Sequence, residues 1–233
     1  MSNLPASSRA PCASCAPGGD DMLRVLFCLL AFLVAWSAGI SPAAAHPHVW
    51  ITARSELVYA PDGSITGVRH AWTFDDMFST YALQGIETKT KGVYTREQLA
   101  PLAQTNVESL KEFGFFTFAK FDGRKTKFNE PVDYFLEYKD TALTLHFLLP
   151  LKAPAKPKLL ALDIFDPSYF IDFAFDEKDP IRLVDAPAAC KMNFQRPNDA
   201  TATAQRLDEN NFANGDNSNY GAMFANKVTV DCP

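Results

Sequence analysis

The sequence predicts an α+β fold in which a mostly antiparallel, sandwich-like β framework carries a two-helix insertion. Short stretches of alternating apolar and polar residues recur along the chain, at the spacing of about 8–12 residues that is typical of β sandwiches. Turn residues separate these stretches. Between the second and third of them, the apolar spacing becomes that of a helix and begins with a capping pattern.

The first two elements are expected to form a hairpin. Residues 46–59 and residues 65–74 alternate as strands do, and residues 60–64 between them read Ala-Pro-Asp-Gly-Ser. Gly63 can supply the positive φ that such a turn requires. In a hairpin of this length, the end of the second strand lies beside the start of the first.

Two helices are expected next. Residues 75–86 suit a short helix, and Thr95 and Gln98 form a capping box at the start of a longer one, which Gly114 ends. The remaining elements are strands at residues 115–121, 133–138, 141–149, 158–165 and 169–175, with a proline-rich surface crossing at residues 150–157.

Composition excludes several classes of protein. Of the 233 residues, 47% are hydrophobic and 21% are charged, which is too apolar for a disordered chain. The net charge is -5 and the pI is about 5.4, so a basic nucleic-acid binder is not expected. Length permits one domain or a small pair of domains.

Residues 22–45 have the pattern of a secretory signal peptide. A positive start is followed by an apolar run over residues 25–36 and by small residues ending at Ala45, and the run is too short to span a bilayer. Cleavage after Ala45 would make His46 the first residue of a periplasmic protein that is not integral to the membrane; an uncleaved anchor is the alternative. Both Met1 and Met22 remain candidate starts. The expected organisation is a leader at residues 1–45, one α+β domain at residues 46–192, and an Asn-rich tail at residues 193–233.

The cysteine pattern depends on that cleavage. Five cysteines are present, and three of them precede residue 46. Cys190 and Cys232 would remain in an oxidising compartment, where a disulfide that ties down the tail is the default expectation. Two free buried thiols are the alternative.

His46 and His48 are the main candidate metal ligands. A free amine and an imidazole on His46 can chelate one ion, and the imidazole of His48 lies on the same face of a strand. Nitrogen donors of this kind suit copper, nickel or zinc. Pro47 has no amide hydrogen, so a square-planar site built from deprotonated backbone amides is excluded. A structural role for both histidines, as caps of the strand, is the alternative.

Carboxylates are expected to complete the site. The hairpin places Asp75 and Asp76 near the histidine pair, although Asp75 equally suits the N-cap of the next helix. Asp166 precedes Pro167 and either closes a turn or brings a carboxylate to the site together with Tyr169.

Two further histidines are weaker candidates. His70 lies on the second expected strand. His146 lies in an apolar strand and is expected to be a core histidine. No nucleophile elbow, H-E-x-x-H motif or phosphate-binding glycine loop is present in the sequence, so we expect a protein that is not an enzyme.

Three segments carry a family resemblance. They are Ala-His-Pro-His-Val-Trp-Ile at residues 45–51, Trp-Thr-Phe-Asp at residues 72–75 and Phe-Asp-Pro-Ser-Tyr at residues 165–169. Over residues 46–197 the chain resembles a bacterial periplasmic family of unassigned function, domain-of-unknown-function family 1007. Members are commonly labelled as periplasmic components of an uncharacterised ABC-type transport system, linked with permeases of the nickel/cobalt exporter type. The resemblance implies a metal-handling accessory protein.

One departure from the family pattern concerns calcium. Members often carry an acidic loop between the two helices that resembles a calcium-binding loop. Here Lys89 and Lys91 stand where oxygen ligands are needed, and Gln98 replaces the bidentate acid. Calcium binding is therefore not expected.

The sequence thus predicts a periplasmic accessory protein that binds a divalent transition metal and exchanges it with a membrane metal permease or ABC-type transporter. The expected ligands are His46, His48, Asp75 and Asp166. Zinc, nickel or cobalt fits the transporter link, and copper fits an N-terminal histidine on affinity order. A copper oxidoreductase with a histidine brace and a metal-free transport adaptor are the alternatives.

Overall fold

In the computed structural model, which describes residues 47–197 and 220–233, the chain begins with the hairpin that the sequence predicts. β1 (Val49–Tyr59) and β2 (Ile65–Phe74) pair antiparallel. Gly63 in the connecting turn has a φ of 81°. Every second residue of β1 from Val49 onward is buried, and the residues between them are exposed or partly exposed.

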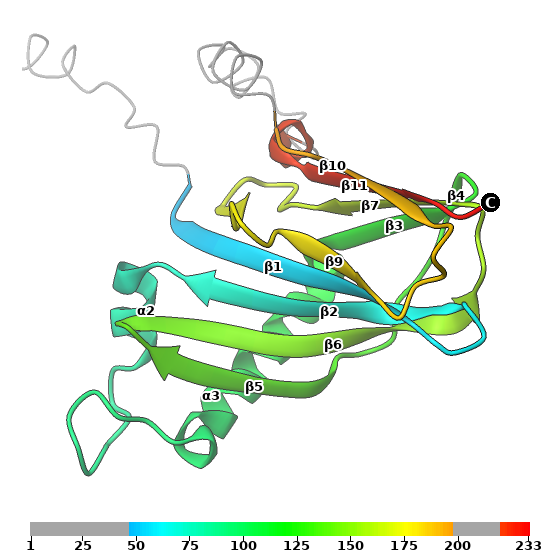
Figure 1. The fold of residues 1–233 in the computed structure, drawn as a ribbon. Helices are drawn as coiled ribbons and strands as arrows, with labels where there is room; N and C mark the ends of the chain where they lie inside the picture. Colours follow the sequence, from blue (N-terminus) through cyan, green and yellow to red (C-terminus); the bar gives the residue numbers. More distant parts are fainter. Residues whose placement is uncertain (1–46, 198–219) are drawn as a thin grey trace, which may run out of the picture. The chain divides into compact units, whose positions relative to one another are not determined.

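The hairpin lies inside a six-stranded sheet. Its order is β5-β6-β2-β1-β8, and β9 also pairs with β1 (Figure 1). All neighbours in this sheet are antiparallel except β8 and β9, which run parallel to β1. The added strands are β5 (Val132–Lys139), β6 (Ala142–Ala155), β8 (Ile171–Phe175) and β9 (Ile181–Val184).

A second sheet contains the C-terminus. Its strands are antiparallel in the order β10-β11-β7-β3-β4. They are β3 (Thr117–Phe121), β4 (Arg124–Lys125), β7 (Leu159–Ile164), β10 (Lys191–Gln195) and β11 (Asn226–Asp231). The expected disulfide is present, because Cys190 and Cys232 are bonded at one end of the β10–β11 ladder.

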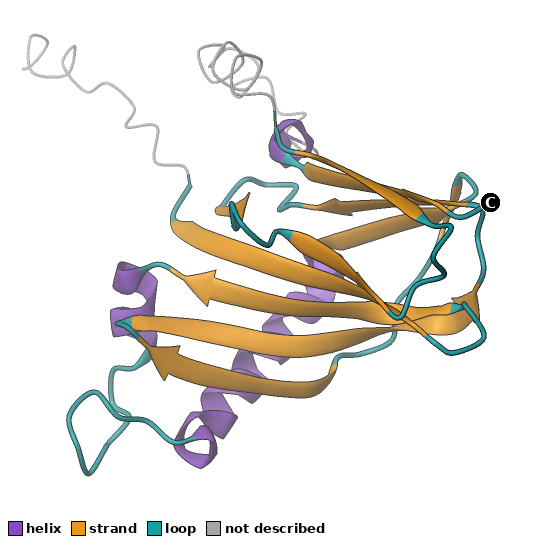
Figure 2. Ribbon diagram, in the orientation of Figure 1, coloured by secondary structure: helices purple, strands orange, loops and turns teal. Residues whose placement is uncertain are grey.

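Two α-helices fall where the sequence predicts them, α2 (Asp76–Ala82) and α3 (Arg96–Leu110). Two 3-10 segments accompany the second sheet, η1 (Lys111–Phe116) before β3 and η2 (Tyr220–Phe224) before β11. Figure 2 shows α3 crossing behind the long strands of the first sheet. Buried side chains of α3 and of both sheets form one hydrophobic core, which includes Leu99, Leu57 and Leu162. The observed fold is therefore α+β, as predicted.

The capping box at Thr95 is formed in full. The hydroxyl of Thr95 accepts from the backbone N–H of Gln98 at 3.3 Å, and the amide oxygen of Gln98 accepts from the N–H of Thr95 at 2.9 Å. We expect Thr95→Ala to lower the free energy of unfolding by about 1 kcal/mol, because one N–H of the first turn loses its partner. Urea denaturation measures this loss. Thr105→Ala on the same helix is the matched control and should change stability by less than about 0.5 kcal/mol; equal effects of the two substitutions would contradict the capping role.

Two expectations for the chain after residue 149 are wrong. β6 continues to Ala155, so residues 150–155 are strand and not a surface crossing. The segment assigned to a loose tail contains β11, which lies between β10 and β7. Every second residue of β11 is buried, with Val228 and Val230 each 1% exposed, and this burial holds the segment in the second sheet. Within the described ranges, no helix is long and apolar enough to cross a bilayer.

Candidate functional site

His48 lies immediately before β1 and is exposed. Its backbone N–H donates to the carbonyl of Phe170 at 2.9 Å, and its ring centroid lies 4.8 Å from that of Phe170. The other expected nitrogen donor, His46, lies outside the described residues. The described part of the site is therefore built around His48.

The alternation of β1 defines two faces of the first sheet. Val49 and Ile51 point into the core, while Trp50, Thr52 and Arg54 are exposed on what we call the outer face. Because side chains two residues apart share a face, His48 belongs with the outer face. Trp50 is 46% exposed and is its nearest neighbour along the strand on this face.

Asp75 lies directly opposite Trp50, as the hairpin predicts. One of its carboxylate oxygens accepts from the N–H of Trp50 at 3.0 Å, and the other accepts from the N–H of Phe78 at 2.8 Å. The second bond makes Asp75 the N-cap of α2. Asp75 can therefore cap α2 and still offer lone pairs to a metal ion, because a carboxylate has about four lone-pair positions and these two bonds use two of them.

Asp166 closes the turn that precedes β8. It is 4% exposed, and its carboxylate accepts from the N–H and the hydroxyl of Ser168, both at 2.8 Å, and from the N–H of Ile171 at 3.0 Å. Gly221 packs so closely on this turn that a Cβ there would lie 1.6 Å from the backbone oxygen of Asp166. Tyr169 in the same turn is buried and stacks on Phe224.

The structure adds Asp172 to the carboxylates that the sequence predicts near the start of β1. β8 runs parallel to β1, with Val49 opposite Ile171 and Trp50 opposite Asp172. Phe173, the next residue, is buried, so Asp172 shares the outer face with Trp50. The sequence shows a strand here but carries no signal for its parallel pairing with β1, which is what brings Asp172 to the start of that strand.

A family model described as "Protein of unknown function (DUF1007)" matches residues 28–232, which is most of the chain. The chain belongs to this family. An uncharacterised 15.5 kDa protein from the trpE 3′ region of Spirochaeta aurantia is 25% identical over 93 residues. That alignment covers 40% of this chain and 66% of the relative, so the chain spans somewhat less than two thirds of the relative's length.

His70 of this DUF1007 protein is a core residue. It is fully buried, its Nδ1 accepts from the hydroxyl of Ser55 at 2.9 Å, and its Nε2 lies 3.3 Å from the hydroxyl of Thr117. That hydroxyl donates to the carbonyl of Phe115, so it accepts from an N–H on Nε2, which fixes the neutral tautomer. Burial lowers the pKa of His70 to about 3. A neutral, enclosed imidazole of this kind is structural.

His146 departs from its expected place in the core. It lies half-buried on the outer face, stacked on Phe135 at 4.5 Å between ring centroids, with Nε2 3.5 Å from a carboxylate oxygen of Glu137. Burial lowers its pKa, and the nearby Glu137 partly opposes this. The alternation of β6 explains the difference, because Leu145 and Phe147 occupy the buried positions on either side.

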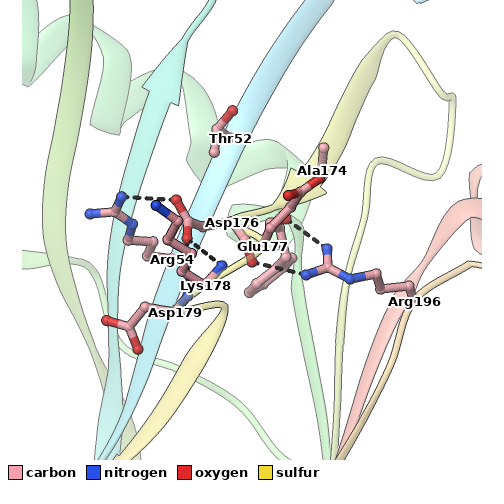
Figure 3. A pocket seen from close by; sticks show the side chains of 9 residues that line it. Thr52, Arg54, Ala174, Asp176, Glu177, Lys178, Asp179 and Arg196 are labelled. Atoms are coloured by element: carbon pink, nitrogen blue, oxygen red, sulfur yellow. Dashed lines mark hydrogen bonds and ion pairs between the residues drawn. The ribbon is translucent and has the colours of Figure 1, made fainter.

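The DUF1007 chain also has a hollow of about 680 Å³ beside β1, lined by Thr52, Arg54 and the loop that follows β8. Figure 3 shows Arg54 turned toward Asp176, and Arg196 turned toward the backbone of the loop. Arg54 donates to Asp176 at 2.8 Å and, together with backbone N–H groups, holds the pKa of that carboxyl at about 2. Arg196 donates to the carbonyls of Phe175 and Asp176. These contacts secure the loop between β8 and β9.

The carboxylates of Asp75 and Asp172 lie on either side of Trp50, which is two residues along the chain from His48. Among residues 47–197 and 220–233, no three histidine, cysteine, aspartate or glutamate side chains are grouped closely enough to hold a metal ion by themselves. The amine and imidazole that the sequence predicts for this site belong to His46, just ahead of the described region.

Proposed function

We propose that this DUF1007 protein is a periplasmic, transition-metal-binding accessory protein of a membrane metal transport system, with the metal held by the mature N-terminal segment His46-Pro47-His48. The observation that carries the proposal is the position of His48. It is exposed immediately before β1, two residues from Trp50. Asp75, which follows β2, and Asp172 on β8 lie opposite Trp50 on its two sides. Signal-peptide cleavage would add the amine and imidazole of His46 at this point.

The donor types favour borderline divalent ions. Imidazole suits zinc, copper and nickel, and a carboxylate is a harder donor that lowers the preference for monovalent copper. Zinc, nickel and cobalt agree with the transport link that the family resemblance implies. Copper(II) is also a candidate, because nitrogen and oxygen sites bind it more tightly than the other divalent ions of the first transition series.

The surroundings of the site are suited to a protein partner. Trp50, Met77, Tyr81 and Phe170 are 46%, 65%, 70% and 45% exposed, and they lie on β1, on α2 and immediately before β8. Exposed apolar side chains that gather into one patch are typical of contact surfaces. A membrane permease or ABC-type transporter that exchanges the metal is the partner we propose.

N-terminal sequencing of the exported protein, followed by metal titration, tests this function. Protein that begins at His46 should bind zinc, and one alanine added before His46 should weaken binding by at least about 100-fold. Removing a residue that only hydrogen-bonds to a metal ligand already lowers metal affinity by about 10–100-fold. Removing a chelating ligand itself should lower it at least as much. His48→Ala should weaken binding to a similar extent.

Two variants serve as controls. An alanine added after Pro233 and His146→Ala should leave the affinity unchanged, since both lie away from His48. Equal affinity of the wild type, the extended protein and His48→Ala would contradict the proposal, because the metal would then be held elsewhere. No binding by the wild type would favour a metal-free adaptor. Turnover of oxygen or hydrogen peroxide by the copper-loaded protein would favour the histidine-brace oxidoreductase.

A further inference from the structure

We propose that this protein contacts an anionic lipid surface through a cluster of exposed cations at the end of its strands opposite α2 (Figure 1). The contact does not involve the candidate metal ligands and does not depend on metal binding. The cluster, which we call the basic end, lies in residues 120–127 and 152–158 and consists of Lys120, Arg124, Lys125, Lys127, Lys152, Lys156 and Lys158.

The fold brings the two segments of the basic end together. β3 and β4 form a hairpin in which Lys120 lies opposite Lys125. Just after this hairpin, the carbonyl of Lys127 accepts from the N–H of Lys152, near the end of β6, at 3.0 Å. The hairpin and the end of β6 therefore present their cations side by side.

The connection from β6 to β7 joins the same cluster. The N–H of Leu159 donates to a carboxylate oxygen of Asp122, in the turn between β3 and β4, at 2.9 Å. This bond places Lys158 beside that turn. Figure 1 shows β4 and the connection between β6 and β7 at the same end of the molecule.

Few of these charges are neutralised within the protein. Among the residues that the structure describes, only Lys156 of the seven forms an ion pair, with Asp62 at 3.3 Å. Asp122 accepts a backbone N–H, and Asp231 at the end of β11 lies opposite Lys191. The whole chain, in contrast, has a net charge of -5. An acidic protein with one basic end is oriented by the electric field of a negatively charged surface.

The pair of Lys120 and Lys125 is unfavourable in the free protein. Both side chains are exposed and lie directly opposite on neighbouring strands, where Cβ atoms are about 4.5–5.5 Å apart and like charges repel. Anionic groups outside the protein would relieve this repulsion. A local arrangement that lowers stability is typical of residues that serve binding.

The composition of the basic end favours a charged surface over a single phosphate group. Six of its seven cations are lysines. A lysine is a hydrated point charge on a flexible stem, whereas arginine provides the planar fork that binds one phosphate through two bonds. Lysines spread over two segments attract many headgroups at once, and each cation near an anionic bilayer raises the affinity about fivefold.

Exposed apolar side chains lie among the lysines. Leu159, which follows Lys158, is 48% exposed, and Phe118, which shares a face of β3 with Lys120, is 37% exposed. Apolar side chains beside cations enter the boundary between lipid headgroups and acyl chains. An anionic bilayer accommodates both kinds of side chain, whereas a soluble polyanion offers charge alone. We therefore assign the basic end to lipid.

Sedimentation of the exported protein with lipid vesicles tests this assignment. The protein should bind vesicles of phosphatidylcholine mixed with phosphatidylglycerol at least about tenfold more tightly than vesicles of phosphatidylcholine alone. Raising the salt concentration from about 0.1 M to about 1 M should release it, because the Debye length falls from about 10 Å to about 3 Å.

A triple variant locates the contact. It carries Lys120→Gln, Lys125→Gln and Lys127→Gln, and it should bind the anionic vesicles about 100-fold more weakly, at about fivefold for each lysine. The matched control removes the same charge from exposed positions at the other end of the molecule, through Lys89→Gln, Lys91→Gln and Lys139→Gln. This control should bind like the wild type.

Far-UV circular dichroism and the urea midpoint check that both variants fold. The test variant should be at least as stable as the wild type, because it loses the repulsion between Lys120 and Lys125. Equal losses of binding in the two variants would overturn the proposal, as would a wild type that binds neither kind of vesicle or both kinds equally. Tighter binding to soluble polyglutamate than to the anionic vesicles would assign the basic end to an acidic protein segment and overturn the lipid assignment. None of these outcomes changes the metal titration that tests the proposed function.

Discussion

Replacing Cys190 and Cys232 together with serine should lower the free energy of unfolding by about 4 kcal/mol. The disulfide joins residues 42 positions apart, and the chain-entropy relation gives about this value for a loop of that length. The bond restricts the unfolded chain, so most of the loss comes from the greater freedom of the unfolded state. Urea denaturation under non-oxidising conditions measures it, and the slope of the transition should rise as the unfolded chain expands.

The disulfide has a local role as well. It closes one end of the ladder between β10 and β11, at the pair Lys191–Asp231. Reductant should therefore destabilise the wild type by about the same amount as the double substitution, and it should leave the double variant unchanged. A loss below about 1 kcal/mol in both experiments would mean that burial of β11 alone orders the C-terminal segment.

Local signals explain the parts of the fold that the sequence predicted well. The hairpin of β1 and β2 follows from alternation on both sides of a turn with Gly63, and the capping box at Thr95 starts α3 where expected. Each of these features depends on residues close together in the chain. The disulfide joins residues far apart in the chain, but the sequence still predicts it. Cleavage after Ala45 would leave two cysteines and hence one intramolecular pairing.

The parts that were missed depend on distant pairing. β8 and β9 join β1 in parallel, with more than a hundred residues between them, and alternation within a strand does not say which neighbour it will take. β11 was hidden by composition, because the residues before it are rich in asparagine. Its alternation over residues 226–231 was the signal available, and it is short.

In the candidate site, too, residues placed by local geometry are predictable and residues placed by distant strand pairing are not. Asp75 was predicted because a hairpin places it by local geometry, and the structure puts its carboxylate on the N–H of Trp50. Asp172 was not predicted, because its place depends on the parallel strand β8. Asp166 was open between two roles, and only its burial and its three hydrogen bonds identify it as a turn residue.

Lowering the pH should destabilise the folded protein through His70. His70 is enclosed between Ser55 and Thr117 with a pKa of about 3, and the cause is burial, which disfavours the charged imidazole. In the unfolded chain its pKa returns to about 6.5. Between these two values the unfolded state holds a proton that the folded state lacks, so stability falls as pH falls, by about 1.4 kcal/mol per unit. Above about pH 6.5 this residue contributes no pH dependence.

We therefore expect the wild type to lose about 2 kcal/mol through His70 between pH 7.5 and pH 5, measured by urea denaturation at each pH. His70→Gln should be less stable at pH 7.5, because its contacts with Ser55 and Trp72 are poorer. Its stability should, however, fall less steeply with acid. The difference between the two slopes isolates His70, since every other titrating group is shared.

A matched control addresses the second histidine with a lowered pKa. Burial lowers the pKa of His146 while Glu137 opposes the shift, so His146 acts in the same direction with a smaller effect. His146→Gln should thus change the pH dependence of the free energy of unfolding less than His70→Gln does.

The pKa values of Asp62 and Asp176 are held near 2, so both remain charged in the folded state between pH 7.5 and pH 5. Parallel stability curves for the wild type and His70→Gln from pH 7.5 to pH 5 would show that the folded protein accepts a proton at His70. The imidazole would then have to be reached by water, which its enclosure between the two sheets opposes.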